Sequence, residues 1–372
     1  MALFADIVGQ ELALTMLRRA LAIGAAHAYL FWGPPGVGQE EAAYAFAAAL
    51  ACAEGGCGVC DACRRARAGI HPDVDVLAPE GAFITVDQIR EVNRDVSLRP
   101  FEARARIYIL LEADTMNKEA ANAFLKTLEE PPPHAHFILV TAFPEILPPT
   151  ILSRCQRVPF GRVPARVLAD HLRARFGLSD LDAVAFARVA RGRVAYGREL
   201  AGDAGARAHR ERLITWARRI PTDSPLETQQ MTDEILASIE RRAETRVAAL
   251  DAAKGRDLEW AGDVRTRTRV EKLYELKSKR ERRKAVTAGL DEVMHTFSGW
   301  YRDLAMVALG ADDAVFNSDY LLELRNEAFP GLVEGYLRAV GAVRGTLDRF
   351  RYNVDARCAL EDMIFSIKEA LL

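Results

Sequence analysis

Residues 33–40 have the glycine spacing of a phosphate-binding loop, but the two side chains that act on phosphate and Mg²⁺ are replaced. In a working loop of the form G-x-x-x-x-G-K-[ST], the lysine contacts the β- and γ-phosphates and the hydroxyl binds the metal. Here Gln39 and Glu40 hold those positions. Glutamine offers the phosphates no charge, and Glu40 would place an anion beside them. We therefore expect this degenerate loop not to work as a nucleotide site; its members are Gly33, Gly36, Gly38, Gln39 and Glu40.

A third departure from a working nucleotide site occurs in residues 107–114, which read Ile-Tyr-Ile-Leu-Leu-Glu-Ala-Asp. An ATPase of this architecture ends the equivalent strand in Asp-Glu, where the Asp holds the Mg²⁺ shell and the Glu orients water. Leu111 stands at the Asp position, whereas Glu112 remains. Any buried strand that ends in acids would look similar. Three losses that serve one cofactor nevertheless predict that ATP hydrolysis and tight ATP binding are lost.

A cluster of four cysteines lies within twelve residues, with spacings of four, two and two intervening residues. Thiolates in C-x₂-C pairs, with glycines around them, suit tetrahedral Zn²⁺. Iron–sulfur ligand runs usually differ in spacing and are followed by proline. Because four protein ligands leave no open position, we expect a structural zinc ion, with reduced free thiols as the alternative. The expected ligands are Cys52, Cys57, Cys60 and Cys63. Cys155 and Cys358 lie elsewhere, and we expect buried thiols there.

The elements that must position these residues follow an α/β pattern over residues 1–160. Expected strands, which should form a parallel sheet, are 28–32, 74–77, 107–111 and 137–141. Expected helices are 11–21, 41–50, 86–96 and 118–128. The first strand and the second helix flank the glycine loop, which is the context that the motif requires. After Phe160 the strand pattern stops, and we expect an all-helical lid domain at 161–205 and an all-helical C-terminal domain at 206–372.

Residues 239–284 form a strongly charged stretch whose only glycines are Gly255 and Gly262. We interpret it as a solvated pair of helices or an extended hairpin. A DNA-binding basic helix is the less favoured alternative, because Glu and Asp are interspersed among its Lys and Arg.

The composition bounds the class of protein. The chain of 372 residues carries 50 Lys and Arg against 52 Asp and Glu, a net charge of −2. That balance does not indicate a nucleic-acid-binding protein, so any DNA contact must come from a local patch. The N-terminus lacks the basic and long apolar regions of a secretory signal, and no apolar run reaches membrane-spanning length. We expect a globular cytoplasmic protein of two or three domains.

Further motifs stand in a fixed order around the degenerate loop. They are Ile7-Val-Gly-Gln-Glu11, His27–Gly33, Glu119–Pro133 with its Leu-Glu-Glu-Pro-Pro, Phe137–Thr141, and Thr150-Ile-Leu-Ser-Arg-Cys155. Together with the cysteine insert, they resemble the clamp-loader branch of the AAA+ ATPases. The resemblance is strong over about residues 1–160 and weaker over 161–205. The last domain is similar mainly in its helical character and in phrases such as Trp300-Tyr-Arg-Asp-Leu.

The resemblance implies a role for Arg154, because the arginine of the Ser-Arg-Cys triplet reaches in trans to ATP on a neighbouring subunit. A planar, permanently charged guanidinium suits phosphate oxygens. It further implies a rigid, non-hydrolysing subunit of the DNA polymerase III clamp loader, with its last domain as a collar. Implied partners are the gamma/tau and delta subunits and, through the complex, the sliding clamp and primer-template DNA. The surrounding holoenzyme is a DNA-directed DNA polymerase that works at the nucleoid-associated replisome.

Two alternatives stay open. The first is an ATP-hydrolysing gamma/tau-type subunit with an unusual loop, against which Gln39, Glu40 and Leu111 argue. The second is an independent zinc-dependent DNA-binding module, which the net charge disfavours. The amides of Gly36 and Gly38 would still permit weak residual nucleotide binding. Several family positions carry no firm assignment: Val8, Gly9 and Gln10 beside an adenine pocket, Thr141 as a first sensor, and Arg193, Ala195 or Arg198 as a second sensor.

Overall fold

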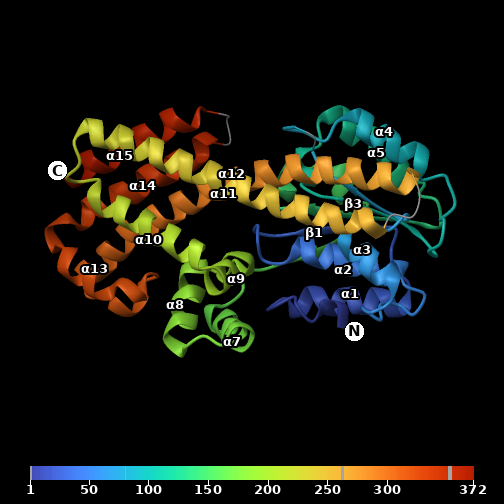
Figure 1. Ribbon diagram of the computed structural model, residues 1–372, viewed down its shortest axis with the longest axis horizontal. Coiled ribbons are helices and arrows are strands. Elements are labelled where there is room, and N and C mark those ends of the chain that lie inside the picture. The colour runs from blue at the N-terminus through green and yellow to red at the C-terminus, as the bar shows by residue number, and fades with distance from the viewer. Residues whose placement is uncertain (1, 80, 261–263, 351–353) are drawn as a thin grey trace. The chain divides into compact units, whose positions relative to one another are not determined.

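The computed structural model describes residues 2–79, 81–260, 264–350 and 354–372. The chain divides into two compact units (Figure 1). Unit 1 comprises Met1–His171 and Ala190–Tyr196, and unit 2 comprises Leu172–Val189 and Gly197–Leu372. Residues 161–205, expected as a separate lid, are shared between the two units in this grouping. The three-domain division therefore stays a prediction.

Unit 1 contains the expected parallel sheet. Its five strands are β1 (Ala28–Trp32), β2 (Val74–Leu77), β3 (Arg106–Leu110), β4 (Ala135–Thr141) and β5 (Gln156–Pro159), in the order β2-β3-β4-β1-β5. Every pairing is parallel, and Trp32 is in register with Thr141 on one side and Pro159 on the other. The α/β prediction is confirmed. The sequence pattern missed β5, because this edge strand begins with exposed Gln156 and Arg157 and has no apolar run.

Helices cover both faces of the sheet (Figure 1). In unit 1 they are α1 (Glu11–Ile23), α2 (Gln39–Ala51), α3 (Asp61–Ala68), α4 (Val86–Asp95), α5 (Lys118–Glu129) and α6 (Pro149–Leu152). The core on the α1 and α2 side includes Phe31 and Phe46, and the core on the α4 and α5 side includes Phe124 and Phe137. Alanines dominate α2, and their small side chains let this helix lie close to the sheet.

Unit 2 is helical over its described residues. Its helices are α10 (Ala204–Arg219), α11 (Pro225–Trp260), α12 (Val264–Ala308), α13 (Leu321–Glu327), α14 (Val333–Phe350) and α15 (Ala356–Leu371). Three further helices lie across the unit boundaries: α7 (Ala165–Phe176), α8 (Asp180–Ala190), of which only Ala190 belongs to unit 1, and α9 (Val194–Gly202). The core gathers Phe297, Trp300 and Tyr301 on α12. Tyr301 Oη donates to Ala217 O at 2.6 Å, which satisfies a buried hydroxyl.

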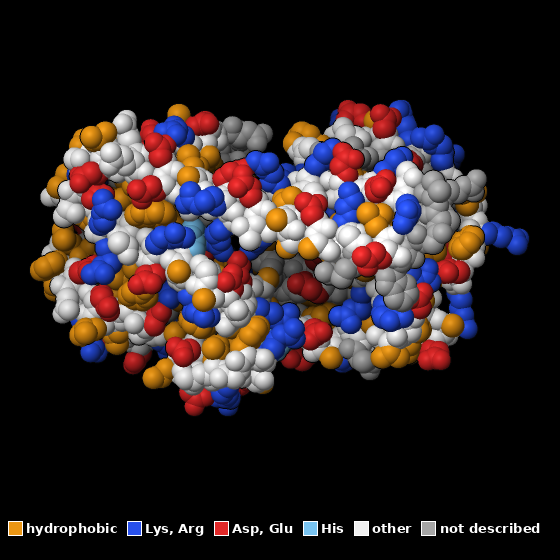
Figure 2. Space-filling view, viewed as in Figure 1, with side chains coloured by type: hydrophobic (Ala, Val, Ile, Leu, Met, Phe, Trp, Pro, Cys, Tyr) orange, Lys and Arg blue, Asp and Glu red, His pale blue; other side chains and the backbone are white. Residues whose placement is uncertain are grey.

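The expected helical pair in 239–284 is confirmed by α11 and α12, which pack side by side. Gly255 lies within α11, whereas Gly262 lies outside the described residues. Among the described helices, none is both long enough and apolar enough to cross a membrane. Acidic and basic side chains are interspersed over the face shown in Figure 2, in line with the small net charge.

Candidate nucleotide site and cysteine cluster

The glycine loop lies between β1 and α2, as its motif requires. Gly33 has φ +152°, and a Cβ there would lie 2.1 Å from Phe160 O, so only glycine fits. Gly36 and Gly38 also have positive φ, at +78° and +112°. Gly38 caps α2 in the left-handed conformation. The backbone therefore has the loop form, with its turn residues in place.

Gln39 makes hydrogen bonds within the glycine loop. Its buried side-chain amide donates from Nε2 to Gly33 O at 2.7 Å and to Pro34 O at 2.6 Å. Both bonds are internal to the loop, and the neutral amide adds no charge toward a phosphate. Glu40 follows in the first turn of α2, where a carboxylate is stabilised by the helix dipole. Gln39 therefore links two carbonyls of the loop, and Glu40 places a carboxylate at the N-terminus of α2.

Gln10 ties the loop to two other segments. Its Nε2 donates to Val37 O at 3.1 Å and to Gly161 O at 2.7 Å, and its Oε1 accepts from Gly161 N at 3.0 Å. From the other side, Ala195 N donates to Gly36 O at 3.3 Å. Of the residues expected near an adenine pocket, Gln10 thus has a full set of backbone partners. These contacts hold the loop at two points, Val37 O and Gly36 O.

The carboxyl end of β3 offers no carboxylate at the position expected to hold Mg²⁺. Leu111 is 1% exposed, and its N–H donates to Leu77 O at 2.8 Å. Glu112 follows with φ 53°, a left-handed conformation that is uncommon for a residue with a side chain. Thr141 Oγ1 donates to Asp114 and accepts from Phe143 N at 2.9 Å. Burial raises the pKa of Asp114, which the Thr141 bond partly offsets.

Arg154 follows α6 and has a side chain that is one third exposed. Its Nη2 pairs with Glu129 Oε1 at 2.6 Å, and its Nη1 donates to Thr150 O at 2.9 Å. Glu129 is the last residue of α5. The next residue, Cys155, is buried, and burial raises the pKa of its thiol to about 12. The guanidinium is thus positioned by a carboxylate and a carbonyl while part of it faces solvent.

The four cysteines expected to bind metal do come together at the end of α2 and the start of α3. Their sulfur atoms all lie within 4.8 Å of one another. Cys52 Sγ is 3.8 Å from Cys57 Sγ and 3.7 Å from Cys60 Sγ, and Cys57 Sγ is 4.0 Å from Cys63 Sγ. Four sulfurs at ~2.3 Å from a tetrahedral ion would be separated by roughly 3.8 Å. The cluster therefore has the spacing of a tetrahedral metal site.

Backbone donors favour thiolate at two of the four cysteines: they lower the pKa of Cys52 and Cys57, whereas burial raises the pKa of Cys63. Cys60 N donates to Cys57 Sγ, and Cys63 N donates to Cys60 Sγ, both at 3.4 Å. Burial alone would raise the pKa of Cys52, but backbone hydrogen bonds from Cys57, Gly56 and Glu54 lower it to about 6. A divalent ion would displace the protons that the remaining thiols share. Of the two other cysteines, Cys155 is buried as expected, whereas Cys358 is exposed beside Asp355 at the start of α15.

Comparison with known proteins finds similar sequences for the part of the chain that contains the glycine loop and the cysteine cluster. Residues 9–164 match the family described as "DNA polymerase III, delta subunit". That part of the chain is therefore similar to subunits of DNA polymerase III. Its relatives include DNA polymerase III subunit delta' of Bacillus subtilis (strain 168), 39% identical over 39% of this chain and 45% of that protein. Another is DNA polymerase III subunit tau of Escherichia coli (strain K12), 43% identical over 41% of this chain and 24% of that protein. The chain thus spans less than half the length of these relatives.

Solved structures similar to the chain include a Thermotoga maritima RuvB Holliday junction branch migration motor, at 17% identity and a TM-score of 0.39. That match covers 57% of this chain and 64% of that one. A DNA polymerase III gamma subunit-related protein from the same organism matches at 19% identity and a TM-score of 0.38, over 76% and 99% of the two chains.

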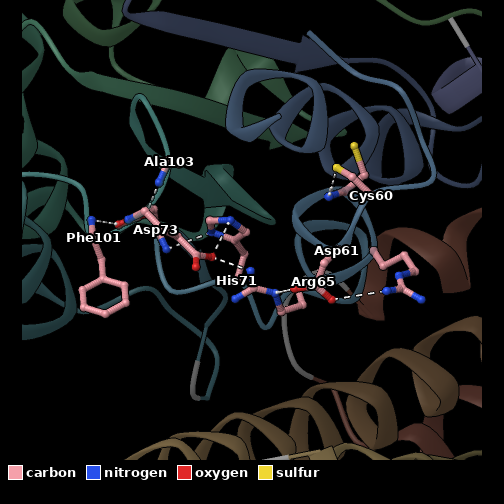
Figure 3. Close-up of polar contacts among 10 residues, drawn as sticks. Cys60, Asp61, Arg65, His71, Asp73, Phe101 and Ala103 are labelled. Atoms are coloured by element: carbon pink, nitrogen blue, oxygen red, sulfur yellow. Dashed lines mark hydrogen bonds and ion pairs between the residues drawn. The ribbon is translucent and has the colours of Figure 1, made fainter. Parts of the chain in front are cut away.

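One polar network near the cysteine cluster was not anticipated (Figure 3). Asp73, fully buried just before β2, accepts from Phe101 N at 2.6 Å and from Glu102 N and Ala103 N at 2.8 Å. Burial would raise the pKa of Asp73, but these backbone donors lower it. The carboxylate therefore fixes the loop that leads into β3. Asp after Pro72, just before an apolar strand, was the available sequence signal.

The same loop is linked to α3 of the cysteine insert. Arg65 Nε is 2.6 Å from Asp61, and Arg65 Nη2 is 2.6 Å from Glu102 Oε1. The buried His71 places Nε2 3.0 Å from the same Glu102 oxygen (Figure 3). Because Glu102 also belongs to the loop that Asp73 fixes, the cysteine insert and the loop before β3 form one connected structure.

Proposed function

We propose that this chain is a clamp-loader subunit of DNA polymerase III that does not hydrolyse ATP itself, in the manner of a delta-prime subunit. The observation that carries the proposal is the Gln39 amide, which bonds to two carbonyls of its own glycine loop. A lysine in that position would face phosphate. The buried Leu111 adds support, because an aliphatic side chain cannot hold the Mg²⁺ shell.

Such a subunit acts as a rigid stator. It needs no nucleotide-driven motion. The hydrogen bonds that Gln10 and Ala195 make to the glycine loop, together with the internal bonds of Gln39, suit a fixed structure. Its proposed partners are an ATP-bearing gamma/tau subunit and a delta subunit. Through the complex it would serve the sliding clamp and primer-template DNA.

In this proposal Arg154 acts on the neighbouring subunit's ATP. A partly exposed guanidinium held by Glu129 is available to phosphate oxygens outside the chain. An arginine supplied in trans stabilises the charge that develops on the transferred phosphoryl group. Arg154 would then be a catalytic residue of a site whose other parts belong to a partner.

The metal proposed for the cysteine cluster is zinc. Four thiolates with tetrahedral spacing match its preferred ligands and geometry, and they leave no position open for chemistry. The ion would stabilise the insert that carries α3 and, through Arg65, the loop before β3.

A second candidate is an ATP-hydrolysing gamma/tau-type subunit. It is favoured by the relatives named tau, which are as similar to residues of this chain as the relative named delta'. Titration of the isolated chain with a fluorescent ATP analogue and Mg²⁺ separates the two. The non-hydrolysing proposal expects no saturation in the micromolar range, and micromolar affinity would support the gamma/tau-type candidate instead.

Assembly provides the complementary test. The proposal expects this chain to co-purify with a gamma/tau and a delta subunit, and the DNA-stimulated ATPase of the assembly to be higher with the chain than without it. If the chain fails to join the other subunits, the stator role is wrong whatever its nucleotide affinity.

A further inference from the structure

The ion pair between Arg154 and Glu129 joins two segments that lie 25 residues apart in the chain. Glu129 ends α5 and is followed, after one residue, by three consecutive prolines at 131–133. Arg154 lies just after α6, a short helix that a pair of prolines at 148–149 introduces. Because proline fixes its own φ and restricts the residue before it, the backbone on both sides of the pair has little freedom.

The residues next to the pair are buried. Leu128 precedes Glu129, Cys155 follows Arg154, and both belong to the hydrophobic core on the α4 and α5 side of the sheet. Ile151 of α6 lies in the same core and is fully buried. Close packing of such a core holds the attached backbone. The two segments therefore stay fixed relative to each other, and only the side chains of the pair remain to be positioned.

The carboxylate holds one corner of the guanidinium and leaves other donors open. Arg154 Nη2 is 2.6 Å from Glu129 Oε1, and Nη1 donates to Thr150 O at 2.9 Å and, at a longer 3.4 Å, to Ser153 Oγ. A guanidinium has five N–H donors. Arg154 Nε has no hydrogen-bond partner among the residues that the structure describes. Phosphate oxygens can therefore bind Arg154 while the pair with Glu129 stays in place.

Stability gives little reason for a carboxylate at this position. Glu129 is the last residue of α5, where the negative end of the helix dipole disfavours an acidic side chain. Its side chain is 49% exposed, and ion pairs with this much solvent contribute little to the free energy of unfolding. A residue that departs from a local rule without a gain in stability is a candidate for a functional role.

We propose that Glu129 is a positioning residue, which holds the Arg154 guanidinium in place for the ATP of a neighbouring subunit. The inference rests on the proposed function, in which Arg154 acts in trans. A long side chain that is already held loses less rotamer freedom when it meets phosphate, so the neighbouring site reacts faster. Glu129 touches no substrate itself and acts only through Arg154.

The test uses the assembled complex of this chain with a gamma/tau and a delta subunit, and it measures kcat and KM of the DNA-stimulated ATPase. The variants are Glu129→Ala, Glu129→Gln, Arg154→Ala and the double variant that combines Glu129→Ala with Arg154→Ala. Glu130→Ala is the matched control, because Glu130 is the adjacent exposed acid at the same end of α5. Gel filtration and thermal unfolding check that each variant assembles and keeps the stability of the wild type.

We expect Glu129→Ala to lower kcat by about tenfold while KM for ATP changes by less than about twofold, because an arginine finger acts on transition-state charge. Glu129→Gln keeps an oxygen that accepts from Arg154 and should stay within about threefold of the wild type. Glu130→Ala should leave kcat unchanged. In the double variant, Glu129→Ala should add no loss to that of Arg154→Ala.

An unchanged or raised kcat for Glu129→Ala, beside a loss for Arg154→Ala, would overturn this inference and leave the proposed function standing. A further loss in the double variant would also overturn it, because Glu129 would then act independently of Arg154. An unchanged kcat for Arg154→Ala would overturn the proposed role in trans and this inference together.

Discussion

The glycine loop and Arg154 lie in the same unit, but their polar side chains differ in burial and in the origin of their hydrogen-bond partners. Gln39 is buried and has both of its amide bonds within its own loop. Arg154 is partly exposed, and its carboxylate partner comes from the end of another helix. The first arrangement is complete without a ligand, whereas the second presents a cation to solvent. This contrast is the basis for proposing that the chain directs its phosphate chemistry outward through Arg154 and not into its own loop.

The largest expected effect comes from removing the partly exposed Arg154. Arg154→Ala should lower turnover at the neighbouring ATP site by about 10³-fold, because the transition-state charge loses its guanidinium. The measurement is DNA-stimulated ATPase of the assembled complex, with gel filtration to show that it stays assembled. Arg157→Ala, which removes a nearby exposed arginine, serves as the control and should leave turnover unchanged. Equal rates for both variants would remove the proposed role of Arg154.

Metal removal should have the next largest effect and should spare the glycine loop. We expect one zinc ion per purified chain, and chelation should cost about 3 kcal/mol of stability when free zinc is about 100 times its Kd. Cys63→Ser should reproduce the loss, whereas Cys358→Ser, at the exposed thiol, should not. Elemental analysis and thermal unfolding provide the two readouts. Substoichiometric zinc with unchanged unfolding would contradict the metal site.

The next prediction concerns Asp73, whose carboxylate fixes the loop before β3. Asp73→Asn should cost about 3 kcal/mol in urea unfolding at pH 7, because its carboxylate serves three backbone donors. The folded pKa of Asp73 is lowered, so its contribution is present above the unfolded pKa of ~3.9 and fades as the pH falls through the lower folded value. The gap between wild type and variant should therefore narrow in acid. Asp87→Asn, at an exposed helix position, should cost under ~0.5 kcal/mol.

The smallest expected effect comes from restoring the two substituted residues of the glycine loop. Gln39→Lys with Glu40→Thr should strengthen ATP binding by about tenfold, since a cation and a hydroxyl return to a loop whose backbone is already in place. Hydrolysis should stay absent because Leu111 is unchanged. Gln39→Leu is the control: it removes both amide bonds without adding charge and should not improve binding. A gain with leucine would mean that release of the loop, rather than restored charge, admits nucleotide.

Sequence reasoning recovered the features that depend on local pattern. Apolar runs predicted β1 and β2 to the residue, and cysteine spacing predicted a cluster that the structure does bring together. It placed β3 one residue late and missed α3, because eight residues rich in arginine give little periodic signal. The sequence could not predict the hydrogen-bond and ion-pair partners of Gln39, Arg154 and Asp73. Each depends on a carbonyl, carboxylate or backbone N–H that the fold brings into place, sometimes from nearly thirty residues away.

Gly33 has a consequence for how such loops are recognised. Its backbone lies against Phe160 O so closely that any Cβ would collide, and this contact has nothing to do with nucleotide. The glycine is therefore required by the neighbouring strand whether or not the loop ever meets phosphate. A sequence search that scores these glycines alone therefore does not test for nucleotide binding. The residues that do so are the two that follow the last glycine, Gln39 and Glu40 in this chain.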